Sequence, residues 1–452
     1  MPILAQPLLS LAMLNAARKA STSPAAVYPR HAGAGPLLVS PNGWRAQNLL
    51  QSVTDAHREG AIRAMKALHD VAPREIDGRE TILRFRMQFQ AAAFAALEIL
   101  RGTDVDRVYC DYHDDFVVRR TVGGRQDYHF FQVKTKAKLN RQFGLNEVFA
   151  LKKVRQGNDK ESLGAIRDSI AGKLFVHTLE FGDACREVTV LSNVHFEDDV
   201  ENLVKGFQAD ATPTKHVEFF LSKFCEIFQL SPALTPDQVK ALTKKLSLVP
   251  GASHIGETLE AFTSASRTAI YNHSEIDLRP HEIDEIAKSL VSLVMTKSCA
   301  RIPGVKRSEL EVLTGIGLED ILGVLSISTE VYKNLLAGED LSAIKTASIL
   351  QRQLTEAGAS EQMIELISRL KVKWDIWLRS ARHIHTELDL QTLLDRIDTV
   401  CMNWLKSGGM IADLRGHISA IAAQIDMARF PNLDEELLFG GVNAAMVRRA
   451  TR

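Results

Sequence analysis

The sequence lacks the features that mark several large classes of protein. Its 452 residues include only 5 cysteines, which are widely scattered and never spaced Cys-x-x-Cys, so we expect neither a disulfide framework nor a zinc knuckle. No apolar run reaches the roughly 18 residues that a membrane helix needs. No Gly-x-x-x-x-Gly-Lys-Ser/Thr loop is present, which excludes ATP hydrolysis by that route. Together these absences predict a cytoplasmic protein that makes no membrane contact.

The chain also has no excess of either charge, because 55 Lys and Arg residues balance 55 Asp and Glu residues. This balance hides an uneven distribution, since the first 54 residues contain no Asp or Glu and are rich in Ala, Ser, Pro and Gly. Such a composition resembles a transit peptide, but the segment lacks a basic N-terminal region and a clear cleavage site. We therefore expect residues 1–54 to be a poorly ordered extension.

Beyond this extension the hydrophobic pattern predicts an α/β domain over residues 55–197. Helical periodicity indicates helices at 52–69, 79–101, 145–154 and 162–179. Short runs of β-branched and aromatic residues predict strands at 107–110, 116–120, 128–135 and 186–193. Gly123-Gly124 separates two of these runs, which favours a hairpin between them.

For the remainder, residues 198–452, the sequence predicts an all-α domain that serves oligomerisation, partner binding or sensing. We find no convincing strand there, whereas helix-start signals such as Thr235-Pro236-Asp237 recur. The clearest helices are expected at 343–356, 361–370, 374–388, 390–406 and 410–427. The Gly-containing run 313–318 resembles a DNA-binding hairpin between helices, but we expect a simple helix–helix turn. The predicted fold class is thus α/β, a mixed sheet flanked by helices, followed by helices alone.

Charged and amide side chains of the first domain occur in an order that suggests metal chemistry. Glu98 lies on an otherwise apolar helix, where a carboxylate is costly to bury without a partner cation. Asp114 and Asp115 open a strand, and Gln132 and Lys134 fall on one face of the next strand. Carboxylate and carbonyl oxygens suit Mg²⁺, and Mn²⁺ is the alternative. This set is what metal-assisted phosphodiester cleavage needs.

We therefore predict Glu98, Asp115 and Gln132 as metal ligands and Lys134 as the catalytic cation that stabilises developing charge. Asp115 is preferred because it leads into the strand and shares a face with Val117, with Asp114 as the alternative ligand. Simpler interpretations exist for each part. Glu98 could pair with Arg101, the two aspartates could form a turn, and the lysines after residue 133 could protect an edge strand.

The charge distribution around these residues supports a nucleic-acid substrate. From residue 119 to 160 there are eleven basic residues and three acidic ones, whereas five aspartates precede them between residues 104 and 115. Phosphate contacts by Lys and Arg supply most of the sequence-independent affinity for nucleic acid. We predict that Lys136, Lys138 and Arg141 bind nucleic acid.

At these residues the sequence resembles the PD-(D/E)xK nucleases, which have a restriction-endonuclease-like fold. It resembles most a bacterial branch found as the N-terminal effector domain of CD-NTase-associated endonucleases and of antiphage proteins that partner HerA-type ATPases. The resemblance spans about a quarter of the chain and rests on 90–98, Tyr112–Phe116, Gln132-Val133-Lys134-Thr135-Lys136 and Leu191-Ser192-Asn193.

The resemblance implies a Mg²⁺-dependent endonuclease of double-stranded DNA with low sequence specificity that acts in antiphage defence. We expect the enzyme to be a homo-oligomer, gated by its helical domain or by a partner such as a HerA-like ATPase. One residue departs from the family pattern, because Gln132 stands where Asp or Glu is usual. The alternative is therefore a weak or inactive nuclease-fold module that serves as a nucleic-acid-binding or assembly subunit. RNA also remains open as a substrate.

Overall fold

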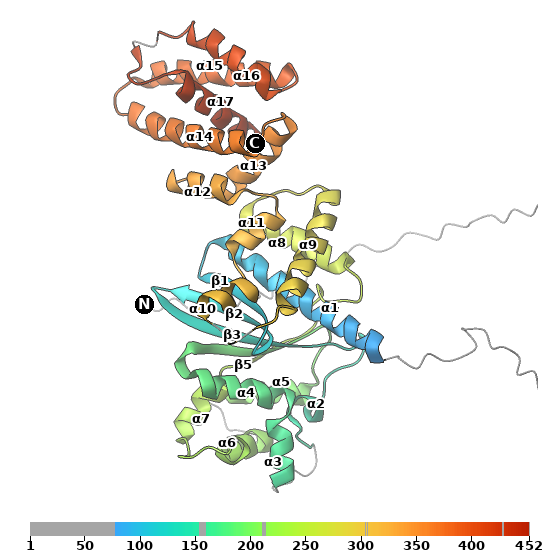
Figure 1. Cartoon of the computed structure of the whole chain (residues 1–452). Helices are drawn as coiled ribbons and strands as arrows, with labels where there is room; N and C mark the ends of the chain where they lie inside the picture. Colours follow the sequence, from blue (N-terminus) through green and yellow to red (C-terminus); the bar gives the residue numbers. More distant parts are fainter. Residues whose placement is uncertain are drawn as a thin grey trace, which may run out of the picture. The chain divides into compact units, whose positions relative to one another are not determined.

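A six-stranded mixed sheet forms the centre of the part of the chain that precedes the C-terminal helices (Figure 1). The computed structural model describes residues 77–152, 160–209, 214–302, 304, 306–426 and 429–451. The strand order is β5-β4-β3-β2-β1-β6. The strands are β1 (Val105–Tyr112), β2 (Asp114–Val122), β3 (Arg125–Lys134), β4 (Cys185–Ser192), β5 (Leu246–Val249) and β6 (Gly315–Ile316). The predicted mixed sheet is confirmed, while the extension at 1–54 and the helix at 52–69 lie outside the described residues.

The sheet combines an antiparallel meander with two parallel crossovers. β1, β2 and β3 pair antiparallel, and the β2–β3 hairpin turns at Gly123 and Gly124, whose φ angles are +57° and +81°. Glycine suits this turn because both positions need the left-handed region. β3, β4 and β5 pair parallel, so that helices must connect them. The carboxyl ends of these three strands and the start of β2 therefore meet at the same end of the strands. We call this end the edge of the sheet, as distinct from its outermost strands.

The prediction that no strand follows residue 198 is wrong, because β5 and β6 both belong to this sheet. β5 is four residues long, too short to show alternation, and β6 has two residues, one of them Gly315. A Cβ on Gly315 would lie 2.6 Å from the Glu311 carbonyl oxygen and 2.9 Å from the Arg107 side chain. The run 313–318 is therefore an edge strand between two helices, paired with β1.

Helices cover both faces of the sheet (Figure 1). On one face, apolar side chains of the strands, such as those of Phe116 and Phe131, pack against α1, α8 and α9. On the other face Val117 and Phe130 pack with the crossover helices. The helices of this part of the chain, on both faces together, are α1 (Asp77–Ala96), η4 (Leu97–Arg101), α2 (Leu145–Phe149), α3 (Lys160–Arg167), α4 (Ile170–Phe181), η5 (Gly182–Ala184), α5 (Asp198–Gln208), α6 (Lys215–Ile227), α7 (Pro236–Thr243), α8 (Glu260–Ser274) and α9 (Pro280–Ser298).

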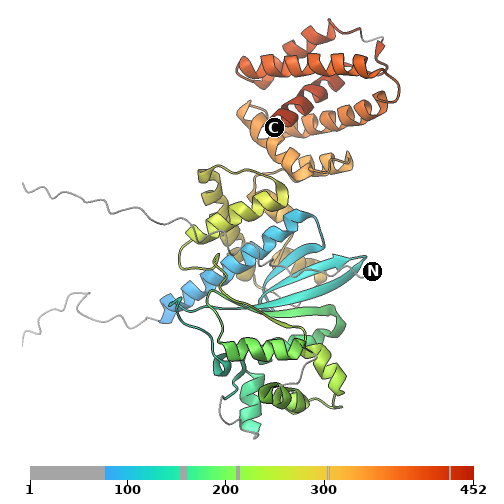
Figure 2. The ribbon, with the colours of Figure 1, turned by 180° about the vertical axis from the view of Figure 1, so that it is seen from behind.

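The C-terminal region is helical, as predicted (Figure 2). It comprises α10 (Arg307–Leu313), α11 (Leu318–Val324), α12 (Thr329–Ala337), α13 (Ala343–Glu356), α14 (Glu361–Ala381), α15 (Glu387–Lys406), α16 (Ile411–Ala422) and α17 (Glu435–Ala450). The helices expected at 361–370 and 374–388 are one helix, α14, because no breaker separates them. α17 packs closely on α14, where a Cβ on Gly440 would lie 2.2 Å from the Leu370 carbonyl oxygen.

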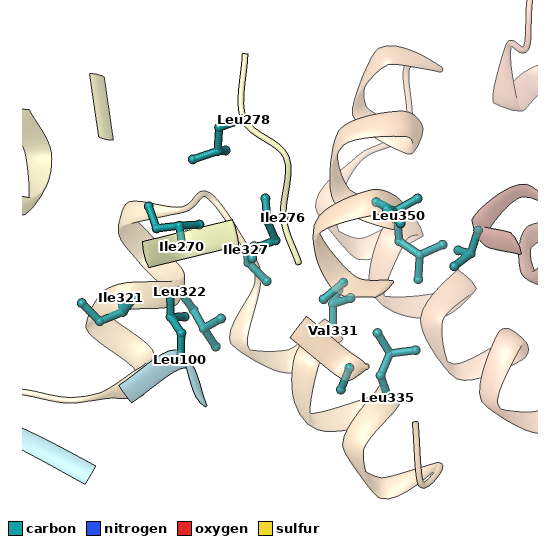
Figure 3. Close-up of a cluster of buried hydrophobic side chains, with 14 of the residues drawn as sticks. Leu100, Ile270, Ile276, Leu278, Ile321, Leu322, Ile327, Val331, Leu335 and Leu350 are labelled. Carbon is teal, nitrogen blue, oxygen red and sulfur yellow. The ribbon is translucent and has the colours of Figure 1, made fainter. Parts of the chain in front are cut away.

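One apolar cluster runs from the sheet into the C-terminal helices (Figure 3). Leu100 of η4 and Ile270 of α8 belong to it, together with Leu322 of α11, Val331 of α12 and Leu350 of α13. Burial of such side chains stabilises by about 1.5–3 kcal/mol each. The two parts therefore share a hydrophobic core. None of the helices that the structure describes is both long and apolar enough to cross a membrane.

Candidate active site

The candidate site lies where β2 and β3 separate. Pairing between the two strands begins at Phe116 and Phe131, so Asp115 and the last residues of β3 do not pair with each other, although those β3 residues still pair with β4. The Asp115 side chain occupies this position. Its Oδ2 accepts a hydrogen bond from the Val133 backbone N–H at 2.5 Å, and its Oδ1 accepts one from Gln88 Nε2 at 2.8 Å. Asp115 thus joins α1 to the end of β3.

The surroundings of Asp115 make its charge sensitive to the neighbouring groups. Burial raises the pKa of Asp115 to about 6, while the nearby Lys134 ammonium and the Val133 N–H act in the opposite direction. The carboxylates of Asp114 and Asp111 contribute a smaller increase. The carboxylate is therefore ionised at neutral pH but remains poorly solvated, a state that a cation would stabilise.

Gln132 and Lys134 end β3 beside this carboxylate. Gln132 is only 9% exposed, and its Oε1 is buried without a hydrogen-bond partner among the residues that the structure describes. Lys134 is half-buried and pairs in register with Ser192 of β4. A buried amide oxygen without a partner is costly. The structure therefore places Asp115, Gln132 and Lys134 at one edge, with an acceptor atom that no residue of the described ranges satisfies.

Asp114, the alternative ligand, is held by a different helix. Its Oδ2 lies 3.2 Å from His177 Nε2 on α4, and the His177 ring stacks on Phe130 with centroids 4.4 Å apart. Its Oδ1 accepts the Asp115 backbone N–H at 3.0 Å. The two aspartates therefore have separate partners, with Asp114 bound to α4 and Asp115 to α1 and β3.

Glu98 lies away from these residues. It forms ion pairs with Arg101 at 2.5 Å and with His273 of α8 at 3.5 Å. Glu98 follows Gln88 by ten residues, which in a helix corresponds to roughly 15 Å. The structure does not bring it to Asp115, and the simpler interpretation, a pair with Arg101, describes its surroundings.

Gln88 contacts the candidate site, and the sequence did not single it out. Its amide lies beside Asp115, where Glu98 of the same helical segment was expected. The available signal was a pair of glutamines, Gln88 and Gln90, at the start of the apolar run of α1. Gln90 is fully buried, and its amide bonds Gly256 N–H and the Thr258 carbonyl oxygen. These bonds fix α1 against the segment after β5.

The predicted nucleic-acid-binding residues differ in their availability. Lys136 Nζ donates to Glu147 at 2.7 Å and to the Gln142 carbonyl oxygen at 2.8 Å, so its positive charge is paired within the protein. Lys138 and Arg141 are exposed in the loop that follows β3. Asn193, part of a motif seen in the sequence, bonds the Lys136 backbone through both its amide atoms at 3.0 Å.

No group of three or more His, Cys, Asp or Glu residues arranged to hold a metal occurs within the described ranges. The oxygen donors at the edge are instead one carboxylate, Asp115, and one amide, Gln132. Such a mixed set of hard oxygens, completed by carbonyls and waters, is compatible with Mg²⁺.

The comparison with protein families agrees with this geometry. Residues 77–298 match the family model of the dsDNA endonuclease domain of Cap4. This region belongs to that family. The predicted membership of the PD-(D/E)xK nuclease-like group is therefore confirmed for the part of the chain that holds the sheet strands β1 to β5.

Three solved structures of Cap4 also show similarity. A receptor from Acinetobacter baumannii with the cyclic trinucleotide 3'3'3'-cAAA is 9% identical over 53% of this chain and 43% of its own, with a TM-score of 0.30. One from Moraxella osloensis is 8% identical over 53% and 46%, with a TM-score of 0.30. A further Acinetobacter baumannii structure is 10% identical over 57% and 48%, with a TM-score of 0.31. The chain spans less than half the length of these structures, and no curated protein sequence matches it.

The family match ends at Ser298, before α10 and β6. Those elements nevertheless join the sheet, since Cys110 N–H bonds the Thr314 carbonyl oxygen at 2.9 Å and Arg119 bonds Glu311 Oε1 at 2.6 Å. The sheet of this Cap4-type domain is therefore completed by residues that lie outside the matched region.

Proposed function

We propose that this chain is a Mg²⁺-dependent endonuclease that cleaves double-stranded DNA with low sequence specificity. The observation that carries the proposal is the buried Asp115 carboxyl beside the half-buried Lys134 where β2 and β3 separate, next to a Gln132 oxygen that has no hydrogen-bond partner among the described residues. Membership of the Cap4 dsDNA endonuclease family over residues 77–298 supports DNA as the substrate.

Asp115 and Gln132 would hold the metal, and Mn²⁺ is the alternative to Mg²⁺. The buried Gln132 Oε1 fits a metal ligand, since a bound cation would supply the partner that this atom lacks within the described part of the chain. When bound, the metal supplies an activated water and stabilises negative charge on the phosphate. Asp114 stays the alternative ligand: Oδ2 contacts His177 and Oδ1 accepts the Asp115 backbone N–H, and an ionised carboxylate has further lone pairs with which it could bind a cation.

The other residues of the edge act on position and charge. Lys134 places a cation beside Asp115, where it stabilises charge that develops on the phosphate or orients the attacking water. Gln88 holds the Asp115 carboxylate in one orientation through its 2.8 Å hydrogen bond. A carboxylate fixed from α1 and from the Val133 N–H needs little reorganisation during the reaction.

We further propose that the enzyme acts in antiphage defence and that its helical region, an oligomeric state or a HerA-like ATPase gates it. An endonuclease of low specificity would damage its host if it were always active. The cluster that joins η4 and α8 to α11, α12 and α13 supports a connection between the helices and the sheet (Figure 3). Lys345 of α13 adds a 2.7 Å ion pair with Glu275 at the end of α8.

The test uses supercoiled plasmid with Mg²⁺ or with EDTA, each with and without a HerA-like ATPase. The wild type is compared with Asp115→Ala and Lys134→Ala, and with the control Lys373→Ala, which removes an exposed lysine of α14. We expect nicking that requires Mg²⁺, is lost in both site variants and persists in the control. Cleavage that survives in both site variants would place the active site elsewhere.

An inactive nuclease-fold module is the second candidate, favoured by the single carboxylate and by Gln132 in place of an acidic residue. This candidate predicts DNA binding with no cleavage under any condition, Mn²⁺ and the partner included. The same plasmid assay, combined with a binding measurement, therefore decides between the two functions.

A further inference from the structure

The segment that follows β3 forms a loop whose two ends are fixed. At its start, the Lys136 backbone bonds both amide atoms of Asn193 at 3.0 Å. The Lys136 side chain then crosses the loop base, with Nζ 2.8 Å from the Gln142 carbonyl oxygen and 2.7 Å from Glu147 Oε1. The same ammonium lies 4.3 Å from the centroid of the Phe143 ring. Lys136 thus closes the loop and does not project from it.

The far end of the loop is anchored to the segment after β4. The Phe143 N–H donates to the His195 carbonyl oxygen at 3.1 Å, and the Glu197 N–H donates to the Phe143 carbonyl oxygen at 3.0 Å. Between the anchors, the Arg141 N–H donates to the Lys138 carbonyl oxygen at 3.1 Å. This bond makes residues 138–141 a β-turn with Leu139 and Asn140 at its corners.

The turn carries an unusual combination of side chains. Leu139 is 71% exposed, and it is flanked by the exposed Lys138 and Arg141. Leu139 follows Lys134 by five residues, so the two Cα atoms are at most about 18 Å apart. The loop thus presents an apolar side chain between two cations, within this distance of the proposed cleavage site. This combination is complementary to a polyanion that also offers apolar surface. Duplex DNA provides both, as phosphates outside and stacked bases in its grooves.

We infer that the 137–142 loop enters the minor groove of duplex DNA, with Leu139 as an apolar wedge between base pairs and Lys138 and Arg141 on the flanking phosphates. Proteins that insert apolar side chains this way partly unstack a base step and kink the duplex. The fixed loop base lowers the ordering cost of binding. This inference rests on the proposed function, because it takes double-stranded DNA as the substrate.

The test measures binding to a duplex that contains 2-aminopurine, with EDTA present so that no cleavage occurs. Leu139→Ser is compared with the wild type and with Leu341→Ser, a matched change at a fully exposed leucine between α12 and α13. We expect Leu139→Ser to weaken binding about tenfold, to remove the fluorescence increase that reports unstacking, and to leave the salt dependence unchanged. Leu341→Ser behaves as the wild type.

Lys138→Gln and Arg141→Gln give the complementary result. Each removes one phosphate contact, so we expect the slope of log affinity against log salt to fall by about one in each variant. The 2-aminopurine signal persists at saturating protein. The melting temperature of every variant is measured as a control for folding. Because the substitutions leave the loop base unchanged, each variant should melt like the wild type.

Two outcomes overturn the inference. If the wild type binds and cleaves duplex DNA but Leu139→Ser keeps both affinity and the 2-aminopurine signal, the wedge is refuted while the proposed nuclease stands. If the wild type neither binds nor cleaves DNA, the proposed function fails and the inference fails with it.

Discussion

Two lysines lie beside aspartates in different parts of this molecule, and their surroundings differ. Lys371 of α14 is only 6% exposed, and its Nζ lies 3.0 Å from Asp340 Oδ2 and 2.7 Å from Asp375 Oδ2. Burial alone would raise the pKa of Asp340, but the bonds to Lys371 hold it below its ordinary value. At the sheet edge, Lys134 does not compensate for burial in this way, and the pKa of Asp115 rises to about 6.

The difference is the one expected between a structural cluster and the proposed metal site. In the α14 cluster the protein satisfies its own charges, so the cluster contributes to folding. At the edge of the sheet the burial of Asp115 is only partly compensated, and Gln132 Oε1 has no partner among the described residues. Such groups cost stability and are retained where a ligand completes them. The comparison predicts opposite responses to mutation.

The largest effect is expected for Asp115→Asn. If Asp115 holds the metal as proposed, loss of its carboxylate should lower the proposed Mg²⁺-dependent cleavage at least about a thousandfold. Stability should not fall with it, because the variant removes a carboxylate whose charged form is disfavoured by burial. The plasmid assay measures cleavage, and thermal unfolding in EDTA at pH 8 measures stability. The exposed Asp413→Asn of α16 is the control. A variant that still cleaves, or that melts well below the wild type, would contradict the comparison.

The opposite pattern is expected for Lys371→Met. Removing the lysine leaves Asp340 and Asp375 without their shared cation, and breaking such a pair costs about 3 kcal/mol. Chemical denaturation measures this loss. Cleavage by the folded fraction should be unchanged, since the site is on the sheet. Lys373→Met, at an exposed position of the same helix, should cost less than about 0.5 kcal/mol. Equal losses in the two variants would show that burial of Lys371 has no special role.

A smaller effect is expected at His254, which stacks on Phe94 of α1 with ring centroids 4.1 Å apart. Burial lowers the pKa of His254 to about 4. Because the folded state holds the ring neutral, stability is present above the ordinary pKa of 6.5 and is lost as the pH falls toward 4. The loss between pH 7 and pH 5 is about 2 kcal/mol.

His254→Phe keeps the stack but cannot titrate, so its stability should change less over this range. Denaturation curves at pH 7 and pH 5 measure the difference, and the exposed His281→Phe is the control. Parallel losses in His254→Phe and the wild type would show that another group is responsible.

The sequence predicted the parts of the fold that have strong local signals. The β2–β3 hairpin follows from Gly123-Gly124 and the alternation on either side, and α13 has the bounds 343–356 that were expected. β5 and β6 were missed because their stability comes from pairing with distant strands and not from their own residues. A strand of two residues that contains Gly315 has no local signal at all.

The candidate site shows the same division. Strand ends and alternation are readable in the sequence, which is why Asp115, Gln132 and Lys134 could be predicted to lie close together. Lys136 was grouped with its neighbours by charge, yet its partners Glu147 and Gln142 are set by the tertiary fold. Gln88 was missed because only the packing of α1 on the sheet brings its amide to Asp115.

Glu98 provides the smallest effect and the sharpest limit on the site. Because it pairs with Arg101 and His273 and lies roughly 15 Å from Gln88 along the helix, Glu98→Gln should change cleavage less than twofold. Gln88→Leu is the comparator, since it removes the donor to Asp115 and should lower cleavage about tenfold through the position of the carboxylate. Initial rates on the same plasmid measure both. A strong loss in Glu98→Gln at unchanged melting temperature would mean that η4 approaches the DNA, and the site would then extend along α1 toward α8.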